Sequence, residues 1–238
     1  MICTILTIMP CSRTSSPDIW SLAWLMVLLV TPALAMADRY EDRQDFSLTV
    51  ASSTTRWVYQ ATPRETRLRS MTVSWVEPLS PSLRGGLNLT YLDTSQATHP
   101  QAVGLDTAGD GLGIDLALQL LNIAHFELGL RFAYDYARTE NRLDGQQIEN
   151  TWTTTTLGLD AELSLGKTLR FLAGTAWVSV EGDERLSGDI NQLTPFAEET
   201  STAYYAGLSI RVDARDHIDL RWMGGYQNGV MLGFTHRY

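Results

Sequence analysis

The sequence predicts an all-β fold, a closed antiparallel β-barrel that spans a membrane. Three observations predict this fold class. The N-terminus has the pattern of an export signal, many later segments of about ten residues alternate apolar and polar side chains, and the last of these segments runs to the final residue, Tyr238. Strict alternation places successive side chains on opposite faces of a strand, and tilted strands of about 9–11 residues are long enough to cross a bilayer.

The N-terminal region predicts an exported protein. An apolar run at 19–30 is followed by small residues with two A-x-A cleavage patterns, which end at Ala35 and Ala37. The run is shorter than the roughly 20 residues of a membrane-spanning helix, but it fits the core of a signal peptide. We therefore expect cleavage after Ala37, which gives a signal peptide at residues 1–37 and a β-barrel domain at residues 38–238.

Composition excludes several classes of function. Both cysteines, Cys3 and Cys11, lie within the predicted signal peptide, so the exported chain has no disulfide, no thiol nucleophile and no cysteine-ligated metal. The formal net charge of −9 makes nucleic acid a poor partner, because such binding needs a basic surface. The residues do not decide whether translation starts at Met1 or Met9.

Nine segments with alternating side chains can be placed from the sequence. In the stretch FELGLRFAYDY, for example, every second residue from Phe126 to Tyr136 is apolar. Such alternation is typical of a strand and not of a helix. The nine predicted strands are residues 67–77, 83–93, 109–120, 126–137, 151–165, 169–181, 201–212, 217–222 and 229–238.

A tenth strand is expected in the stretch DFSLTVASSTTRWVYQ, residues 45–60. The apolar residues change from one face to the other within ASSTT, so we expect a bulge there. Ten strands are favoured because both termini should lie on the same side of the membrane, which requires an even number. Eight strands remain the alternative if residues 45–60 form an arm or one hairpin is misplaced.

The polar faces of these strands favour a narrow barrel interior. They carry six carboxylates and six arginines but no lysine: Arg84, Asp115, Glu127, Arg131, Asp135, Asp160, Glu162, Arg170, Arg211, Asp219, Arg221 and Arg237. The face of a soluble β-sandwich that meets water would favour Lys and Glu, whereas paired Arg and carboxylates suit a confined interior. The width of a barrel interior grows with the number of strands, and a general porin needs about 16. In this smaller barrel we expect ion pairs between neighbouring strands to fill the lumen.

The connections alternate between short and long segments. The predicted short turns are residues 78–82, 121–125, 166–168 and 213–216. The predicted long loops, all on the opposite side, are residues 94–108, 138–150 and 182–199, and they are acidic. Aromatic residues predict girdles at both membrane surfaces: Tyr91, Tyr134, Tyr136, Trp152, Trp177, Tyr204, Tyr205 and Trp222 at the loop ends, and Trp75 and Tyr238 at the turn ends.

The last strand carries a family resemblance. The final segment GVMLGFTHRY alternates up to an aromatic terminal residue, as a strand that closes a barrel would. With the export signal and the alternating strands, it resembles the small outer-membrane β-barrels of Gram-negative bacteria, including the outer-membrane protein A-like (OmpA-like) barrels. The terminal Tyr238 departs mildly from the commoner Phe. The resemblance implies a location in the outer-membrane bilayer and recognition of the C-terminal strand by the barrel-assembly machinery.

No cofactor, metal or catalytic site is predicted. The four histidines fall in different segments without the spacing of metal ligands: His99, His125, His217 and His236. The stretch DTAGDG, residues 106–111, partly matches a calcium loop, but Ala108 and Ala117 stand where oxygen ligands are required. We interpret this stretch as a plain loop.

Two classes of barrel enzyme and a channel remain as alternatives. The stretch DARDHID, with Asp216 and His217, resembles part of the omptin protease site, and His236 lies on the lipid-facing side, as a residue of lipid A deacylase barrels would. Neither has the partners that those sites need. The favoured hypothesis is a non-enzymatic outer-membrane barrel with a structural or surface-interaction role. A narrow, low-conductance channel is the further alternative, and the sequence leaves the extracellular ligand and the oligomeric state undecided.

Overall fold

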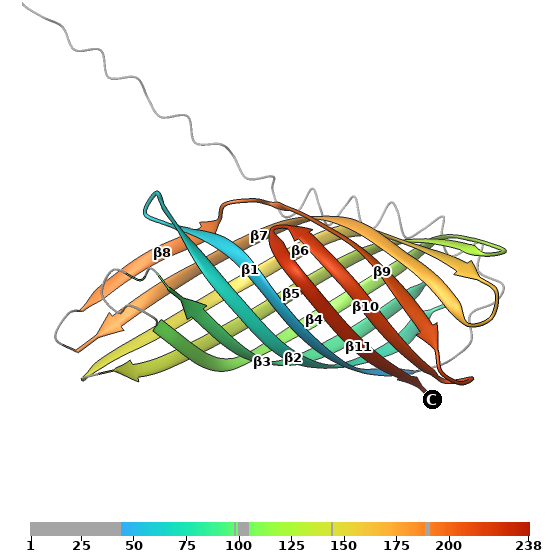
Figure 1. Cartoon of the computed structure of the whole chain (residues 1–238), viewed down its shortest axis with the longest axis horizontal. Coiled ribbons are helices and arrows are strands. Elements are labelled where there is room, and N and C mark those ends of the chain that lie inside the picture. The colour runs from blue at the N-terminus through green and yellow to red at the C-terminus, as the bar shows by residue number, and fades with distance from the viewer. Residues whose placement is uncertain (1–43, 98, 100–104, 144, 189–190) are drawn as a thin grey trace, which may run out of the picture. The chain divides into compact units, whose positions relative to one another are not determined.

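The computed structural model describes residues 44–97, 99, 105–143, 145–188 and 191–238, whose regular structure is all β-strand (Figure 1). The strands are β1 (Asp45–Tyr59), β2 (Thr62–Ser80), β3 (Leu83–Gln96), β4 (Leu105–Ile123), β5 (Phe126–Leu143), β6 (Gln146–Leu165), β7 (Leu169–Ser187), β8 (Gln192–Glu198), β9 (Thr202–Arg211), β10 (Asp216–Gly225) and β11 (Gln227–Arg237). Within these ranges, no helix is long and apolar enough to cross a membrane. The predicted signal peptide, residues 1–37, lies outside the described residues.

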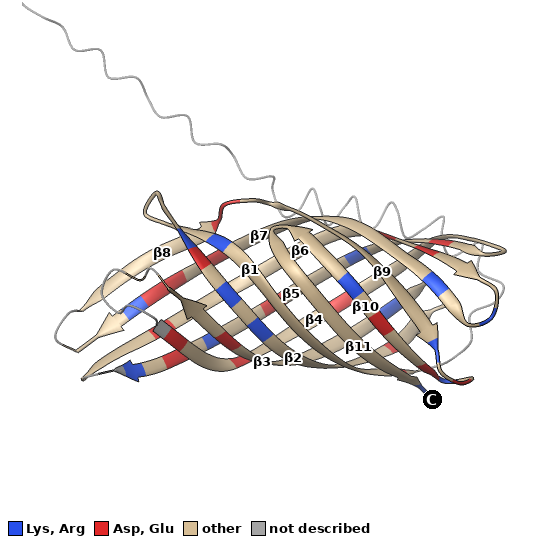
Figure 2. Ribbon diagram, viewed as in Figure 1, with Lys and Arg blue, Asp and Glu red and all other residues tan. Residues whose placement is uncertain are grey.

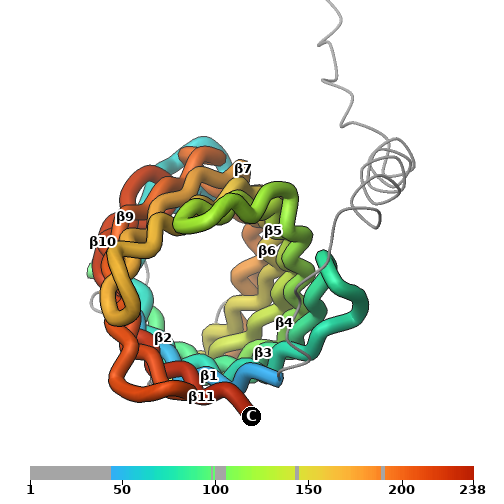
Figure 3. Tube along the Cα trace, turned by 90° about the vertical axis from the view of Figure 1, so that its right-hand side faces the viewer, coloured from blue at the N-terminus to red at the C-terminus, as the bar shows by residue number. Residues whose placement is uncertain are grey.

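Ten of the strands form a closed antiparallel ring. The order is β1–β2–β3–β4–β5–β6–β7–β9–β10–β11, and β11 pairs back to β1. This closing seam extends from Asp45 opposite Arg237 to Thr55 opposite Gln227. Figure 3 shows the ring from the end at which the C-terminus lies. The predicted ten-stranded barrel and the predicted pairing of the last strand with the first are both confirmed.

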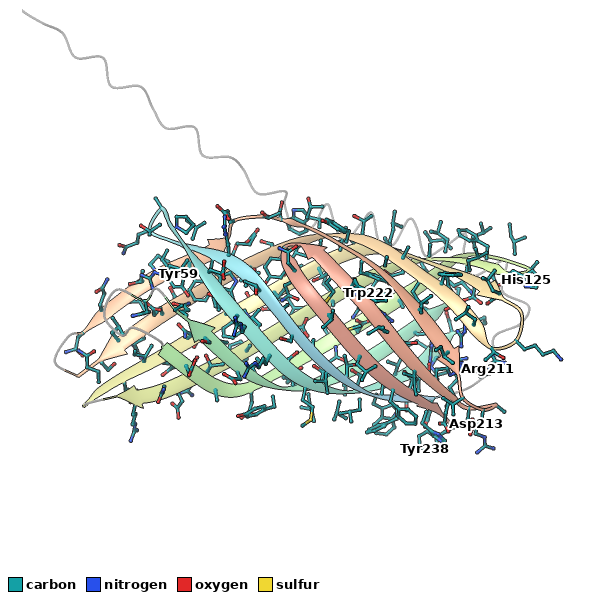
Figure 4. All side chains as sticks on the ribbon, in the orientation of Figure 1. Tyr59, His125, Arg211, Asp213, Trp222 and Tyr238 are labelled. Carbon is teal, nitrogen blue, oxygen red and sulfur yellow. The ribbon has the colours of Figure 1, made fainter. Side chains whose placement is uncertain are left out.

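The two ends of the barrel differ. The C-terminal end holds Tyr238, the start of β1 and the joins at residues 81–82, 124–125, 166–168 and 212–215. The far end holds the turn at residues 60–61, the last residues of β3, β5 and β7, and the first residues of β4, β6 and β8. Figure 4 marks the far end by Tyr59 and the C-terminal end by Arg211, Asp213 and Tyr238. The first and last strands therefore begin and end on the same side, as predicted.

The strand β8 changes the number of strands in the ring at the far end. The β10–β11 hairpin turns at Tyr226, short of the tips of the other strands, whereas β1 continues past it (Figure 1). There β1 pairs with β8, with Trp57 opposite Glu198 and Tyr59 opposite Phe196, and β8 pairs with β7. The ring at the far end therefore contains eight strands, β1 to β8, and it continues the ten-stranded ring of the C-terminal end. The sequence did not predict this change.

The apolar side chains of β1 change faces along the strand. Near the C-terminal end, Phe46, Leu48 and Val50 lie on the outer wall and are exposed, whereas Trp57 and Tyr59 near the far end are buried in the interior. The pairing of β1 with β2 is continuous along the whole strand, so the predicted bulge within ASSTT is wrong. The environment changes instead. An apolar outer face suits lipid, and an apolar inner face suits a barrel wall that meets water.

Other strands show the same exchange of faces. On β6, Leu159 is exposed on the outer wall, but Trp152 and Ile148 further along are buried inside; on β7, Phe171 is exposed and Val180 is fully buried. The halves of the strands toward the C-terminal end thus form a lipid-facing belt. The remaining halves form a barrel extension with a polar outer wall and a packed interior. The chain is therefore a transmembrane β-barrel with an extension that stands outside the bilayer.

The extension corrects the predicted loops. Most of residues 138–150 and 182–199 is strand, and residues 94–96 and 105–108 of the first predicted loop belong to β3 and β4, because β3 to β7 are 14 to 20 residues long and β8 lies within the third segment. At the β1–β2 join, Gln60 and Ala61 have φ angles of 46° and 71°, the backbone of a tight two-residue hairpin turn. The three predicted loops were interpreted as loops because they are polar, but both faces of a strand that extends beyond the lipid can carry polar residues.

The aromatic residues confirm the belt in part. Tyr91, Tyr136, Trp177, Tyr204 and Trp222 are exposed on the outer wall at the edge of the belt nearer the far end, and Trp75 and Tyr238 are exposed near the C-terminal end. The positions predicted for Trp152 and Tyr205 are wrong. Trp152 is 6% exposed in the interior, and the Tyr205 hydroxyl donates to Asp160 inside the barrel.

The two halves of the outer wall should respond differently to a new charge. We expect Leu89→Arg, in the middle of the belt, to destabilise the folded barrel by about 2–4 kcal/mol. Thr153→Arg, on the outer wall of the extension, should cost less than about 0.5 kcal/mol because this position meets water. Denaturant titrations of folding into lipid vesicles measure both values. Equal costs at the two positions would contradict the proposed position of the bilayer.

Candidate functional site

Ion pairs link the strands inside the barrel near the C-terminal end. Asp45 of β1 accepts a hydrogen bond from Arg84 of β3 with an Nη2–Oδ2 distance of 2.6 Å, and its other oxygen lies 3.3 Å from Nε of Arg237 on β11. Arg170 of β7 donates to Glu162 of β6 at 2.8 Å. The expected pairing of interior acids and arginines between strands is thus observed for these residues, and it narrows this mouth of the barrel.

A polar cavity of about 560 Å³ lies further inside, within the membrane-spanning half. Serine and threonine side chains line much of its wall. Arg131 donates from Nε to Asp115 at 2.7 Å, and the Tyr205 hydroxyl donates to Asp160 at 2.9 Å. Arg221 lies 3.5 Å from Asp219 and places its guanidinium 5.0 Å from the centre of the Tyr205 ring. Charged and hydroxyl side chains therefore line the lumen at this level.

An aromatic cluster fills the interior where the ten-stranded ring becomes the eight-stranded one. We call it the aromatic plug: Trp57, Tyr59, Trp152, Phe196 and Tyr226. The Trp57 and Phe196 rings stack at a centroid distance of 4.7 Å, and the Trp57–Trp152 and Tyr59–Phe196 distances are 5.2 and 4.9 Å. Aliphatic side chains complete the packing: Leu68, Ala137, Val178 and Val180. Trp152 and Tyr226 of the plug, together with Leu68 and Val178, line the cavity at this end.

The tip of the β10–β11 hairpin anchors the plug. The Tyr226 backbone N–H donates to the Thr202 carbonyl at 2.7 Å, and the Tyr226 carbonyl accepts from the Thr55 hydroxyl at 2.7 Å. These two bonds hold the turn of the hairpin against Thr55 and Thr202. The Tyr226 side chain, 7% exposed, points into the interior. The same turn that reduces the strand number thus also supplies part of the plug.

A buried ionic cluster lies beyond the plug, inside the extension. Glu184 of β7 contacts Arg64 of β2 with an Oε1–Nη1 distance of 3.1 Å, and its other oxygen lies 3.1 Å from Nε2 of His99. The Arg64 guanidinium also stacks on the Tyr59 ring at 4.0 Å, and Gln96 donates to the Tyr59 hydroxyl at 2.7 Å. Breaking such a buried pair leaves an uncompensated charge, so the cluster fixes the strands that carry it.

Protonation in this cluster follows from burial and from the partners. Burial alone would raise the pKa of Glu184, but the hydrogen bond from His99 and the charges of His99 and Arg64 outweigh it, so the pKa lies below its usual value. Burial, with the nearby Glu184 charge, raises the pKa of Tyr59 far above neutrality. Glu184 is therefore a carboxylate and Tyr59 a neutral phenol at physiological pH.

The residues weighed as metal ligands do not come together. His99 lies in the buried cluster, His125 in a turn at the C-terminal end, and His217 and His236 on β10 and β11. The described residues contain no group of three or more His, Cys, Asp or Glu side chains that could hold a metal ion. The interpretation of residues 106–111 as a loop is wrong. They belong to β4, because the strand extends beyond the lipid.

The residues of the two enzyme alternatives lie at the C-terminal end. Asp216 pairs with His236 across the β10–β11 hairpin, with an Oδ1–Nδ1 distance of 2.6 Å, and not with His217. The His236 ring also contacts the edge of the Tyr238 ring, at a centroid distance of 4.6 Å. His217 is 3% exposed, on the inner side of β10. This arrangement differs from the Asp216–His217 pairing considered from the sequence.

Sequence reasoning did not identify the plug or the ionic cluster. Trp57 and Tyr59 appeared only as the end of a strand, Trp152 was assigned to the outer girdle, and Glu184 was assigned to a solvated loop. The change of apolar phase within ASSTT was the available signal. This change marks the level beyond which apolar side chains pack inward. Interpreted as a change of environment and not as a bulge, it would have predicted the buried position of Trp57 and Tyr59.

Comparison with known proteins finds similar solved structures but no family. No protein-family model matches the sequence, and a search of curated proteins finds no match. Among solved structures, the chain is similar to the translocator domain of the autotransporter NalP from Neisseria meningitidis, with 11% identity, a TM-score of 0.47, and coverage of 92% of this chain and 97% of that one. It is also similar to the outer membrane protease OmpT from Escherichia coli, with 9% identity, a TM-score of 0.48, and coverage of 84% and 97%.

A third similar structure is an outer membrane channel from Pseudomonas putida F1. It has 12% identity and a TM-score of 0.47, and the match covers 85% of this chain and 97% of that one. The chain's own closed ring of strands and its lipid-facing belt fit a small outer-membrane β-barrel, as the sequence resemblance implied.

The interior pair of Arg131 and Asp115 should contribute to stability. Arg131→Leu leaves Asp115 without its cation in the lumen, and we expect a loss of about 1–3 kcal/mol in the free energy of unfolding. The combined Arg131→Leu and Asp115→Asn variant should recover part of this loss, because no charge is then left unpaired. Unfolding titrations in lipid vesicles test both, and a double variant no more stable than Arg131→Leu would argue against the pair.

The stability of the extension should depend on pH through Glu184. Its pKa is lowered in the folded state, so its stabilising contribution is complete above the ordinary value of 4.5 and is lost as the pH falls through the lowered value. We expect the difference in unfolding free energy between wild type and Glu184→Gln to be largest near neutral pH and to shrink below about pH 4.5. Denaturant midpoints measured at several pH values give this difference. A difference that stays constant down to pH 3 would refute the ionic role of Glu184.

Proposed function

We propose that this chain is an integral outer-membrane β-barrel whose lumen is closed and whose role lies in its extension outside the bilayer. The observation that carries the proposal is the aromatic plug. Trp57 and Tyr59 are 0% and 2% exposed and pack with Tyr226 in the interior, and this packing supports the proposal that the plug closes the cavity toward the far end. The protein is then a structural or surface-interaction barrel and not a pore.

The orientation in the membrane follows from assembly. We place the C-terminal end in the periplasm and the extension outside the cell, on the prediction that the chain is exported, and β1 begins where β11 ends, at that one rim. The last strand, β11, ends with Tyr238 at that rim and closes the seam with β1. Recognition of this strand by the barrel-assembly machinery belongs to the proposal, as does a grouping with OmpA-like barrels.

A rigid extension supports a surface role better than flexible loops would. Its strands continue those of the membrane barrel, and its interior is fixed by the plug and by Glu184, which is 1% exposed. Side chains on its outer wall are thus held in constant positions. Binding residues usually lie on loops that a rigid scaffold positions, and the extension would position its own connecting turns in this way.

The alternatives have weaker support. An enzyme would need a nucleophile or an activated water beside the Asp216–His236 pair, and we propose that this pair only holds the β10–β11 hairpin at its open end. A narrow channel is favoured by one observation, the cavity of about 560 Å³, which is large enough for a small molecule or several waters. It requires the plug to move, and that requirement can be tested directly.

Conductance recording in planar bilayers separates a closed barrel from a channel. We expect no steady openings from the wild type. The variant Trp152→Ala/Phe196→Ala should produce openings, because it removes two rings of the plug. The matched control Trp177→Ala/Phe171→Ala removes the same residue types from the lipid-facing wall and should remain silent.

Folding of each variant is verified by its resistance to SDS before heating, so that a silent record is not caused by unfolding. Steady wild-type openings would overturn the closed-barrel proposal in favour of the channel. A folded plug variant that stays silent would show that the aromatic plug is not what closes the lumen.

A further inference from the structure

A row of arginines stands directly beyond the lipid-facing belt on β2. The outward side chains of this strand run from Trp75 and Met71, which are about half exposed, to Arg69 and then Arg67. Arg69 has 63% of its side chain exposed, and Arg56 on the neighbouring β1 has 62%. Figure 2 shows these cations as blue segments on β1 and β2.

The spacing along the strand places these side chains at the level of lipid headgroups. Two residues along a strand advance about 6.6 Å, and the tilt of barrel strands reduces this to roughly 5 Å along the barrel axis. Arg69 then lies roughly 5 Å beyond Met71, and Arg67 roughly 10 Å beyond it. The headgroup layer of each leaflet is roughly 5–8 Å thick, and arginine side chains can lean along a surface to place the guanidinium at the polar layer.

The protein leaves these guanidinium groups largely open to a ligand. Arg69 approaches Asp93 only at 3.9 Å, and Arg56 approaches Glu199 only at 3.7 Å, both longer than a hydrogen bond. Arg67 has no ion pair with a described residue. The register instead places it between two hydroxyl side chains on the same face, Thr54 of β1 and Ser95 of β3. Guanidinium groups flanked by hydroxyls provide the donors that a phosphate group accepts.

The charge on the outer wall of the extension is uneven. The outward positions of β1, β2 and β3 carry one positive charge in excess: Arg56, Arg67 and Arg69 against Glu65 and Asp93. Those of β4 to β7 carry three negative charges in excess: Arg138, Arg142 and Arg185 against Asp106, Asp110, Glu140, Glu149, Glu181 and Asp183. On β5, Arg138 lies at the same step beyond the belt as Arg69, but it is already bonded to Glu149 at 3.1 Å. An anionic ligand would therefore prefer the β1–β3 side.

On β1, Ser52 lies directly opposite Arg69. We propose that the outward row of Arg67 and Arg69, with Thr54, Ser52 and Ser95, binds the phosphate groups of an anionic lipid in the leaflet around the barrel. The occupant is a lipid because the row adjoins the exposed apolar side chains of Val50, Met71 and Tyr91. A molecule that contacts both the apolar side chains and the arginine row needs acyl chains against the former and phosphates beside the latter. This inference rests on the position of the bilayer and on the outer wall, and it does not depend on whether the lumen is closed.

Lipid binding tests the proposal with the full-length mature protein in nanodiscs of phosphatidylcholine. Bisphosphorylated lipid A is added, and native mass spectrometry counts the molecules that each protein retains. We expect Arg67→Gln/Arg69→Gln to weaken the retention of lipid A on the order of tenfold, because charge-assisted hydrogen bonds are lost. The matched control Arg138→Gln/Arg142→Gln removes two outward arginines from β5 and should change retention by no more than about twofold.

Competition distinguishes the source of the phosphate and the class of partner. Millimolar inorganic phosphate should not displace lipid A, since it lacks acyl chains, and phosphatidylcholine should not be selectively retained by any variant. The proposal is overturned if Arg67→Gln/Arg69→Gln retains lipid A as well as the wild type, or if the β5 control loses as much. It is also overturned if dextran sulfate, a soluble polyanion, binds through Arg67 and Arg69 while lipid retention is unchanged. In each case the conductance record is unaffected, so the closed-lumen proposal stands or falls separately.

Discussion

The boundary between lipid and water on the outer wall determines which face of each strand must be apolar. Below this boundary the outer face meets acyl chains, so Leu89 and Leu159 point outward and the interior can be polar. Above it the outer face meets water, so the apolar side chains must be buried inside, as Trp57 and Val180 are. A single continuous wall thus follows the rule of a membrane barrel along one half and the rule of a soluble barrel along the other. Strand length, interior packing and the position of the plug all follow from where this exchange occurs.

The change from ten strands to eight allows side chains to fill the interior of the extension. A barrel of eight strands has an interior that side chains can fill, whereas ten strands enclose a wider space. In this chain the wider ring contains ion pairs and a polar cavity, and the narrower ring contains stacked aromatic rings and a buried carboxylate. Tyr226 lies at the transition because the short hairpin ends there, and its backbone is held by Thr55 and Thr202.

Much of the membrane-spanning half was predictable from the sequence, because alternation with lipid outside is a periodic signal. The segments around Leu116, Leu130 and Leu208 were placed on the correct strands, and the closing of the last strand onto the first was expected from its aromatic end. The interior acids and arginines were also recognised as pairs, although the partner of each depends on the register between strands, which a single segment does not specify.

The extension was not predictable in the same way. Its outer positions, such as Glu181 and Asp183, are polar because they meet water, and its inner positions include Glu184 and Asn150 as well as Ile148 and Trp152. Polar residues on both faces resemble a solvated loop in sequence, so the strands were ended too early. The Glu184 cluster unites side chains from β2, β7 and the join after β3, and only the closed ring brings these segments together.

The seam beside β1 has a consequence for how the barrel can open. Along most of its length β1 is held by the many backbone hydrogen bonds of its pairing with β11, but at the far end it is held by three residue pairs with β8 and by the bond from the Glu199 N–H to the Arg56 carbonyl. That short join is too small to be stable alone, and the residues that form it, Trp57, Tyr59 and Phe196, are also members of the plug. Their stacked rings therefore help to hold β1 against β8. Parting β1 from β8 and clearing the lumen are one movement, so this barrel would open sideways at the same moment that it opens along its axis.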